Sequence, residues 1–330
     1  MNNISNKDHL AKPYPLDKFD RILLTELDKN AAAPLLHLAK SLHRSKQFVL
    51  YRMKKLEQIG IITGYHAIVD MSKLGYFTFR IYFDLQNITE TEKKEMINYL
   101  KIIPGIWTIT TMHEKWDLAL FLGVKNVQEF HTLREKICLR YKEKIKKDNV
   151  SIYAPIYNFN RSFLPYIPSQ RSERTYGIGS PTTLSEFDLT LIKTYAKNVR
   201  QSSLEIAKIL NVSADTVRSH IKKLEQQKVI VGYKLGLNLE LLGYQSYRID
   251  IELKSLIRNK ELYTYCKYHK NIYQINKTIG GADFEIEVIV RDKQHLLLLI
   301  DELKQKFRDM IVDTDYFGFS TFHVLQYIPD

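Results

Sequence analysis

The chain contains an internal repeat. Shifted by 168 residues, positions 16–85 align with 184–253 without a gap, and 26 of the 70 aligned pairs are identical. Ordinary composition would give roughly four or five identities over that length. The longest shared run, Lys-Lys-Leu-Glu-Gln, occupies 54–58 and 222–226. Because a repeat of this kind folds into the same elements twice, the sequence predicts two copies of one structural unit.

The start of each copy predicts three short helices. Apolar residues recur at helical spacing, and a turn of three to four residues separates the second helix from the third. Ser45 and Ser213 stand where a side-chain oxygen can cap the third helix. The predicted inward positions of the third helices are Val49, Met53 and Leu56 in copy 1 and Val217, Ile221 and Leu224 in copy 2. Residues 60–65 and 229–233 predict a β-turn-β wing, which would complete a winged helix-turn-helix.

The remainder of each copy alternates strands and helices in the order βαββαβ, the ferredoxin-like split unit. In copy 1 we expect strands near 76–85, 106–112, 117–124 and 150–157 and helices near 90–102 and 126–141; in copy 2, strands near 244–253, 272–279, 283–290 and within 312–328 and helices near 257–270 and 293–308. Helices would cover one face of each antiparallel sheet, leaving the other face to pack against a second sheet. The predicted fold class is α+β.

These patterns divide the chain into six predicted segments. They are a flexible N-terminal arm at 1–15, a winged helix-turn-helix at 16–69, a ferredoxin-like domain at 70–157, a linker at 158–183, a second winged helix-turn-helix at 184–237 and a second ferredoxin-like domain at 238–330. The linker is predicted because three Pro, two Gly and four Ser occur there without an apolar period.

The composition favours a polyanionic partner. Lys and Arg number 49 against 37 Asp and Glu, a formal net charge of +12, which fits nucleic acid best. No apolar run is long enough for a membrane span, and the N-terminus lacks the apolar core of a secretory signal. Two cysteines, Cys138 and Cys266, are too few and too distant for a disulfide framework or a zinc knuckle. We therefore expect no membrane association, no metal and a reducing, cytoplasmic location.

The stretch from Ser203 to Tyr233, SLEIAKILNVSADTVRSHIKKLEQQKVIVGY, resembles the signature of the Lrp/AsnC (feast/famine) transcriptional regulators. The resemblance covers both copies, although two fused copies depart from the usual single-copy protomer. It implies a sequence-specific regulator that binds double-stranded DNA and whose ferredoxin-like RAM domains pair through their sheets. Here that pairing would form an intrachain pseudo-dimer, and further self-association into a homo-oligomer is expected from the family.

The third helix of each copy carries the predicted DNA contacts, because its polar residues lie opposite the inward positions. Gln, Ser or Arg would read base edges and Lys would contact phosphates. The residues predicted to contact DNA are Arg44, Ser45, Lys46, Gln47, Tyr51, Arg52, Lys54 and Lys55 in copy 1 and Ser213, Asp215, Thr216, Arg218, Ser219, Lys222 and Lys223 in copy 2. The alternative is a solvated helix surface. Since the two sets differ, the copies are predicted to read non-identical half-sites, unless one copy has lost its DNA contact.

Copy 2 contains a second candidate site between its middle strands. Gly280, Gly281 and Asp283 resemble the family's Gly-x-x-Asp hairpin, which implies binding of a small-molecule effector such as an amino acid. Glycine allows a positive φ there, and Asp can accept an amine or simply cap a hairpin turn. In copy 1, Glu114 and Trp116 occupy this region, so one working pocket per chain is predicted, with no other cofactor.

Three further interpretations stay open. An architectural DNA-binding protein with weak sequence preference would have the same composition. A siroheme-decarboxylase-like enzyme resembles the same architecture, and His113 lies near its expected histidine, but the Tyr-x-Arg-x-x-His run is absent and His113 can equally be a surface residue. No common catalytic motif occurs, so no enzymatic activity is predicted. The basic run at 134–147 is either a solvated helix face or a secondary phosphate contact.

Overall fold

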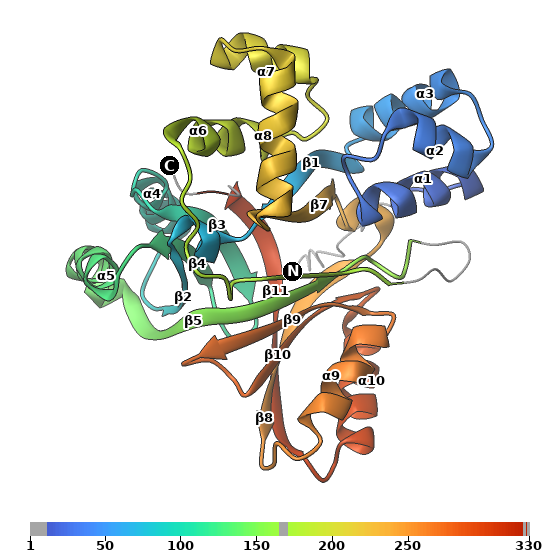
Figure 1. Ribbon diagram of the computed structural model, residues 1–330. Helices are drawn as coiled ribbons and strands as arrows, with labels where there is room; N and C mark the ends of the chain where they lie inside the picture. The colour runs from blue at the N-terminus through green and yellow to red at the C-terminus, as the bar shows by residue number, and fades with distance from the viewer. Residues whose placement is uncertain (1–11, 165–170, 326–327, 329–330) are drawn as a thin grey trace, which may run out of the picture.

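The computed structural model describes residues 12–164, 171–325 and 328. Two groups of three helices lie on one side of a large β-structure, and each is called a head below (Figure 1). Head 1 contains α1 (Lys18–Lys29), α2 (Leu35–Leu42) and α3 (Lys46–Gln58), and head 2 contains α6 (Glu186–Tyr195), α7 (Ser203–Leu210) and α8 (Ala214–Gln226). The three predicted helices of each copy are thus confirmed.

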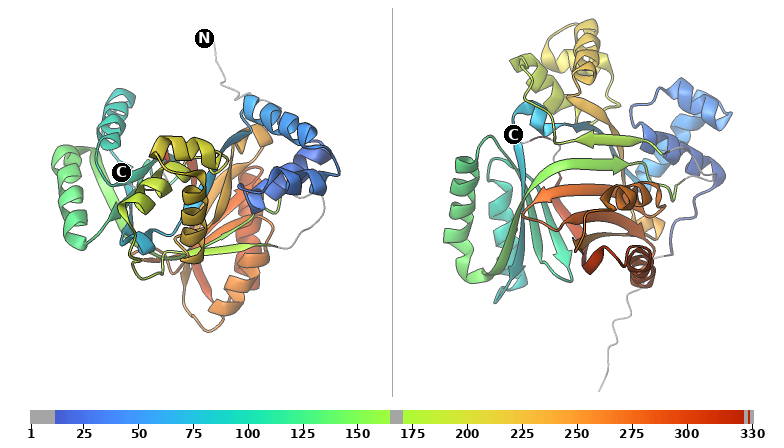
Figure 2. Two further views of the ribbon diagram at one scale, coloured as in Figure 1. Left: turned by 45° about the horizontal axis from the view of Figure 1, so that its top comes forward. Right: turned by 60° about the horizontal axis from the view of Figure 1, so that its bottom comes forward.

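Each copy continues with the predicted βαββαβ order. Copy 1 contributes β2 (Phe77–Leu85), α4 (Glu90–Lys101), β3 (Ile106–His113), β4 (Leu118–Val124), α5 (Val127–Tyr141) and β5 (Ile145–Phe159). Copy 2 contributes β8 (Gln245–Leu253), α9 (Asn259–Tyr268), β9 (Ile272–Ile279), β10 (Phe284–Val290), α10 (Lys293–Lys306) and β11 (Ile311–Leu325). The two helix pairs cover opposite outer faces of the β-structure (Figure 2).

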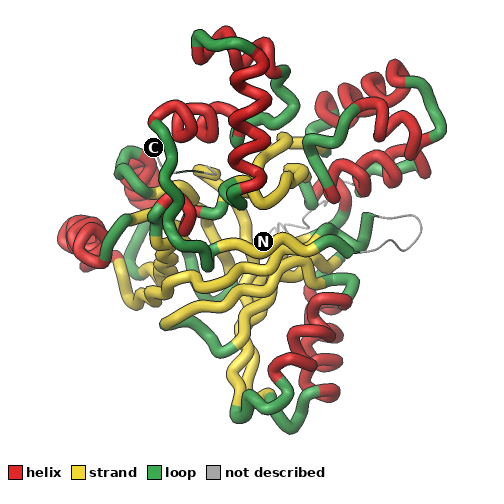
Figure 3. The backbone as a smooth tube through the Cα atoms, viewed as in Figure 1, coloured by secondary structure: helices red, strands yellow, loops and turns green. Residues whose placement is uncertain are grey.

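The strands of both copies form one continuous sheet in the order β2-β4-β3-β11-β8-β10-β9-β5-β6, and a β2–β5 pairing closes its first eight strands into a ring. β5 and β11 make this closure possible. β5 pairs with β2 over 145–152 and then with β9 of the other copy over 152–158. β11 pairs with β8 over 311–318 and with β3 over 318–325. The two expected sheets are therefore joined by backbone hydrogen bonds as well as facing each other (Figure 3).

Alternation along the strands separates an outer apolar layer from a polar interior, since successive side chains point to opposite faces. On β2, Phe79, Ile81 and Phe83 join the core that packs against α4 and α5. On β10, the residues at 284, 286, 288 and 290 join the core beneath α9 and α10. The intervening positions face inward, and they carry buried charges, as shown below.

The predicted wing hairpins are wrong. Each copy contributes a single strand, β1 (Ile62–Val69) or β7 (Ile230–Leu237), and the two pair antiparallel with each other. The closed ring of eight strands is called the barrel below. The β1–β7 pair is called the roof, because it lies between the heads and the barrel (Figure 1). A strand edge needs a hydrogen-bonding partner, and the second copy, held nearby by the barrel, supplies it.

The predicted linker is also more ordered than expected. β5 extends into it to residue 159, and β6 (Glu173–Tyr176) adds to the edge of the sheet beside β5. Arg161 and Arg174 from this segment are buried. Hydrogen bonding to α1 explains this order, because Arg161 pairs with the Asp28 carboxylate and Arg174 donates to the Asp28 and Lys29 carbonyls at 2.6 and 2.8 Å. Residues 165–170 lie outside the described residues.

The described end of the predicted arm packs against copy 2. The Tyr14 amide donates to the Leu241 carbonyl at 2.8 Å. Pro13 lies so close to Gly243 that a Cβ there would come within 2.6 Å of its ring. Residues 12–15 are therefore held in place, whereas 1–11 lie outside the described residues.

Candidate nucleic-acid interface

The third helix of each head has one face in the core. Val49, Met53 and Leu56 of α3 are buried, as are Val217 and Leu224 of α8, whereas Ile221 is half-buried. These residues recur at i, i+4 and i+7, one stripe of an α-helix. The inward positions predicted from the sequence are confirmed for the five buried residues.

Serine caps begin both helices. The Ser45 hydroxyl accepts from the Phe48 amide at 3.2 Å, and the Ser213 hydroxyl accepts from the Thr216 amide at 3.0 Å. Thr216 also exchanges a hydroxyl hydrogen bond with Ser213 at 2.8 Å. A helix N-terminus carries partial positive charge, which these caps leave facing solvent. The predicted contacts Ser45, Ser213 and Thr216 thus first serve to start their helices.

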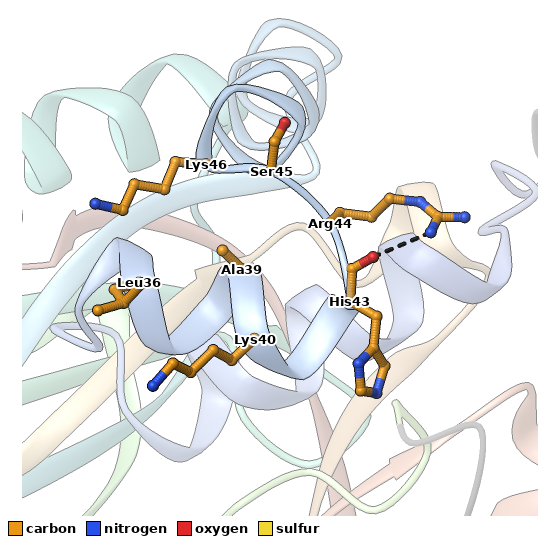
Figure 4. Close-up of a pocket in the computed structure, with 7 residues that line it drawn as sticks. All are labelled: Leu36, Ala39, Lys40, His43, Arg44, Ser45 and Lys46. Carbon is orange, nitrogen blue, oxygen red and sulfur yellow. Dashed lines mark hydrogen bonds between the residues drawn. The ribbon is translucent and has the colours of Figure 1, made fainter.

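The turn before α3 is strongly basic. His43 adopts a left-handed conformation at φ 51°, and the Arg44 guanidinium lies 4.6 Å from the centre of the Phe19 ring and donates to the His43 carbonyl at 3.0 Å. Lys40 and Lys46 flank a shallow hollow of about 830 Å³ beside this turn (Figure 4). The hollow is open and presents three cations, a surface suited to phosphate.

The outward faces of α3 and α8 are exposed. Tyr51 is 64% exposed, and Gln47, Lys46 and Lys54 are exposed around it. On α8 the exposed residues are Asp215, Arg218, Ser219 and Lys222. Lys46, Lys54 and Lys222 form no ion pair with another described residue, so their charge is available to an external anion.

Several other predicted contact residues form ion pairs within their own head. Arg52 pairs with Asp17 at 2.6 Å and with Asp20 at 3.2 Å, which joins α3 to α1. Lys223 pairs with Asp188 at 3.0 Å. Arg218 forms an ion pair with Asp215 on the same helix, and Lys55 is half-buried.

Asp20 and Asp188 are buried at the same place in the two heads, but the pKa of Asp20 is raised and the pKa of Asp188 is lowered. Burial, and next the charge of Asp17, raise the pKa of Asp20 despite the Arg52 charge. Burial would also raise the pKa of Asp188, but hydrogen bonds from His220 and Lys223 hold it well below its usual range. His220 reaches the carboxylate at 2.7 Å from the position that Arg52 occupies in head 1. These ion pairs between the first and third helices were not predicted from the sequence, although the repeat places an aspartate at the same position in both copies, Asp20 and Asp188.

The predicted effector residues form a tight hairpin between β9 and β10. Asp283 accepts a hydrogen bond from the Leu253 amide at 2.8 Å, and Asp117 accepts one from the Leu85 amide at the same distance in copy 1. Gly280 has φ +83°, as Glu114 does in copy 1. The carboxylate of Asp283 thus already has a backbone partner, and effector binding here stays a prediction.

Gly281 lies over a buried charge network inside the barrel. A Cβ at Gly281 would come within 3.1 Å of the Arg80 guanidinium. Arg80 forms two hydrogen bonds with Glu285, at 2.8 and 2.9 Å. Arg248 contacts Glu285 from the other side and pairs with Glu287 at 2.8 Å. The signal available in the sequence was Arg80 and Arg248, which are identical in the repeat yet lie in apolar strands.

The remaining candidates have local partners. In the basic run, Arg134 pairs with Asp148 at 2.6 Å and Lys146 with Asp84 at 3.0 Å, which favours a structural role for those side chains. His113 is exposed at the end of β3, and its ring meets that of Tyr247 edge to face at 5.7 Å. Within the described residues, no cluster of three or more potential metal ligands occurs. None of their helices is long and apolar enough to cross a bilayer.

Comparisons with known proteins match these elements. A family model described as winged helix-turn-helix DNA-binding matches residues 16–63 and 184–231. The uncharacterized HTH-type transcriptional regulator PF0054 of Pyrococcus furiosus is 30% identical over 139 residues, which cover 42% of this chain and 90% of the relative. PH1916 of Pyrococcus horikoshii, another uncharacterized HTH-type transcriptional regulator, is 34% identical over 121 residues, covering 36% of this chain and 79% of the relative. Each relative therefore corresponds to about one copy of the repeat.

A solved structure matches the arrangement of both copies. The siroheme decarboxylase NirDL superposes with a TM-score of 0.62 at 15% identity, covering 94% of this chain and 93% of that chain. Its complex with an iron-uroporphyrin III analogue gives a TM-score of 0.63 at 14% identity, covering 94% and 95%. At this identity the likeness concerns the fold. It shows that two fused copies occur in the same arrangement in another protein.

Proposed function

The chain belongs to the Lrp/AsnC family of DNA-binding helix-turn-helix transcriptional regulators, and we propose that its two heads read the two halves of one DNA site. The ring of strands and the roof join the copies as two protomers of a dimer would be joined. Covalent linkage keeps the second head at high effective concentration once the first has bound. The chain thus acts as an intrachain pseudo-dimer, and it regulates transcription rather than catalysing a reaction.

The observation that carries this proposal is the exposed face of each third helix. Both helices start at a serine cap, turn an apolar stripe inward and present lysines that form no ion pair with another described residue. Such a helix can enter the major groove, with polar side chains at base edges and lysines at phosphates. In this proposal Gln47 and Tyr51 on α3 and Ser219 on α8 read bases, and Lys46, Lys54 and Lys222 contact phosphate. Arg52 and Lys223 act indirectly, because they hold each helix against its head.

The two outward faces differ, which favours a site with unequal halves. Gln47 and Tyr51 of α3 correspond in the repeat to Asp215 and Ser219 of α8. A carboxylate in place of an amide, and a serine hydroxyl in place of a tyrosine, present different hydrogen-bonding groups to the base edges. The preferred DNA site is therefore not a perfect inverted repeat.

Selection from a random duplex library at about 150 mM salt tests the proposal. Wild type is compared with Lys54→Ala, with Lys222→Ala and with Lys304→Ala, a matched control because Lys304 is an exposed lysine on α10, far along the chain from either head. We expect wild type and Lys304→Ala to enrich the same two-part motif. Lys54→Ala and Lys222→Ala should each weaken selection of a different half.

Other outcomes would contradict the proposal in distinct ways. Retention without any motif would support an architectural protein with weak sequence preference. Enrichment of a perfect inverted repeat would overturn the unequal halves. If only one lysine variant changed the motif, one head would have lost its DNA contact.

A second candidate is an enzyme acting on a tetrapyrrole. The observation that favours it is the likeness to NirDL over nearly the whole chain, together with a cavity of about 1850 Å³ whose lining includes His113. Incubating the chain with siroheme and following loss of carbon dioxide tests this candidate. Turnover by wild type that His113→Ala abolishes would support it, and absence of turnover would exclude it.

A further inference from the structure

A large cavity lies between the roof and the barrel. Its volume is about 1850 Å³, and both copies contribute to its lining. From the roof, Thr63, His66, Ile68 and Val69 of β1 and residues 234–237 of β7 line it, and all eight strands of the ring line it from the barrel. This volume exceeds the 300–1,000 Å³ typical of small-molecule sites, so the cavity has room for an extended ligand.

A lysine points to the charge of that ligand. Lys234 lies on the roof and lines the cavity, and its ammonium group makes no ion pair or hydrogen bond with a described residue. Burial, and next the charge of Arg161, lower the pKa of Lys234 to about 8. The lysine is thus mostly protonated at neutral pH although its surroundings disfavour the charge. An anion placed beside it would relieve this cost.

The nearby carboxylates are already satisfied. Asp28 is paired with Arg161, which also lines the cavity. Glu287 accepts hydrogen bonds from Arg248 at 2.8 Å and from Tyr273 at 2.7 Å. Lys234 therefore faces Arg161, Arg174 and His66 without a carboxylate of its own. This end of the cavity carries an excess of positive charge.

Aromatic rings line the rest of the cavity. Phe121 and Tyr153 lie nearly parallel, with centroids 6.1 Å apart and an interplanar angle of 15°. Phe319 and Phe322 stack in a similar way on β11, at 6.1 Å and 23°. Trp107 adds a further ring. Such faces favour a flat, apolar body by stacking and burial.

We propose that this cavity binds an organic anion with an extended aromatic body, whose charged group contacts Lys234 and whose rings lie against Phe121, Tyr153 and Phe319. The site is separate from the hairpin at 280–283, and it is the same cavity that the second candidate function assigns to a tetrapyrrole, which is one ligand of this chemistry. Ligand binding itself does not depend on the proposed function. Its effect on DNA does rest on that function.

The roof connects this site to both heads. β1 follows α3 and β7 follows α8 directly along the chain. β1 is also bonded to head 2, because the Tyr65 carbonyl accepts from the Val199 amide at 2.9 Å. A ligand that contacts the underside of the roof therefore contacts the element that sets the spacing of the heads. A ligand that binds one spacing of the heads more tightly than another shifts the chain toward that spacing. Occupancy of the cavity thereby alters the affinity for DNA.

Two fluorescent probes that differ only in charge test the inference. 8-Anilino-1-naphthalenesulfonate carries the aromatic body and an anionic group, and N-phenyl-1-naphthylamine carries the same body without the charge. Their binding is titrated on full-length wild type, Lys234→Met, Ser320→Trp and Lys304→Met. Ser320 lines the cavity and is exposed, so a tryptophan there fills space without removing a buried contact. Lys304→Met controls for the loss of a lysine elsewhere.

We expect Lys234→Met to weaken the anionic probe about tenfold, because the variant loses a charge-assisted hydrogen bond, and to leave the neutral probe unchanged. Ser320→Trp should weaken both probes, and Lys304→Met neither. Equal weakening of the anionic probe by Lys234→Met and Lys304→Met would overturn the site. So would unchanged binding of both probes to Ser320→Trp.

A DNA titration at saturating anionic probe separates the two proposals. A change in DNA affinity of about fivefold or more in wild type, absent in Lys234→Met, supports coupling between the sites. If the probe binds as expected but the chain binds no DNA, the proposed function fails and the site stands. DNA binding that the probe leaves unchanged would remove the coupling.

Discussion

The two heads are alike inside and different outside. Asp20 and Asp188 occupy the same position in the repeat, and each ties its first helix to its third. The turns before the third helices differ much more. Arg44 and Lys46 of head 1 correspond to Val212 and Ala214 of head 2. The interior positions preserve a fold, whereas the exposed ones determine what each head can bind.

The barrel shows a second difference between the copies. Arg80 on β2 lies opposite Phe121, whereas Arg248 on β8 lies opposite Glu287. Copy 2 thus provides the carboxylates that both buried arginines need, and copy 1 provides none at the equivalent positions. The two buried arginines are therefore neutralised only when copy 1 pairs with a copy that carries Glu285 and Glu287. The two halves of the chain are not interchangeable.

Removing a carboxylate from copy 2 should have the largest effect. Glu285→Ala leaves two buried guanidinium groups short of a partner, and we expect the free energy of unfolding to fall by about 3–5 kcal/mol. Urea denaturation measures this change. Glu95→Ala, at an exposed position on α4, is the matched control and should change little. Equal stability of the two variants would show that the network contributes nothing to holding the copies together.

The basic turn of head 1 should dominate the salt dependence of DNA binding. Arg44→Ala combined with Lys46→Ala removes two cations, so the slope of log K against log salt should fall by about two and the affinity by roughly tenfold. Lys208→Ala removes the lysine that head 2 retains at the position of Lys40 and should reduce the slope by about one. Fluorescence anisotropy over a salt series measures both. Similar slopes for the two variants would mean that the heads contact phosphate equally.

The two aspartates should respond oppositely to acid. The pKa of Asp188 is held below its ordinary value, so its contribution to stability is complete above about pH 4 and is lost as the pH falls through the folded-state pKa. The pKa of Asp20 is raised, so its protonated form is favoured in the folded head, and stability falls as the pH rises through that pKa. Asp188→Asn should cost about 1–3 kcal/mol at neutral pH, and less at pH 3.

Asp20→Asn is the comparison for this prediction. Thermal unfolding of wild type and both variants at pH 7 and pH 3 measures the difference. The Asp20→Asn variant should retain its stability relative to wild type better at pH 7 than Asp188→Asn does. Identical pH profiles of the two variants would contradict the assignment of different electrostatic states.

The two hairpins should differ in stability cost, and the change in copy 1 should be the smallest of all. Gly280 has φ +83°, and a Cβ there would lie 2.7 Å from the Val150 carbonyl oxygen, so Gly280→Ala should cost about 1–3 kcal/mol. Glu114→Gly removes a side chain from the same conformation but also its 2.9 Å ion pair with Lys293, and the net change should stay below about 1 kcal/mol. Differential scanning calorimetry compares them. A larger loss for Glu114→Gly would mean that copy 1 depends on its ion pair more than on backbone strain.

Much of the fold was predictable because it depends on local patterns. The helices expected near 90–102 and 126–141 are found at Glu90–Lys101 and Val127–Tyr141, and the serine caps are where the sequence places them. The strand at 150–157 was predicted too short, because β5 runs from 145 to 159 and pairs with both copies. The additional residues at both ends of β5 mix polar and apolar side chains, so the sequence shows no clear end to the strand. The strand edges available for pairing determine where β5 ends.

The candidate site was predictable in part for the same reason. Exposure of Gln47, Tyr51 and Lys54 follows from helical periodicity. The engagement of Arg52 by Asp17 and Asp20 does not, because it depends on how α3 crosses α1. Lys234 gave no sequence signal, since its position above the cavity results from the roof pairing.

The duplication was visible from aligning the chain with itself, and the three helices, the βαββαβ order of each copy and the family resemblance were visible from residue spacing within one copy. The tertiary structure decided that β1 pairs with β7, that β5 and β11 close one ring of strands, and that Arg80 and Arg248 share the carboxylates of copy 2. The contacts between the two copies join residues more than a hundred positions apart. They depend on which edges and charges meet when both copies fold together, which spacing along the chain does not encode.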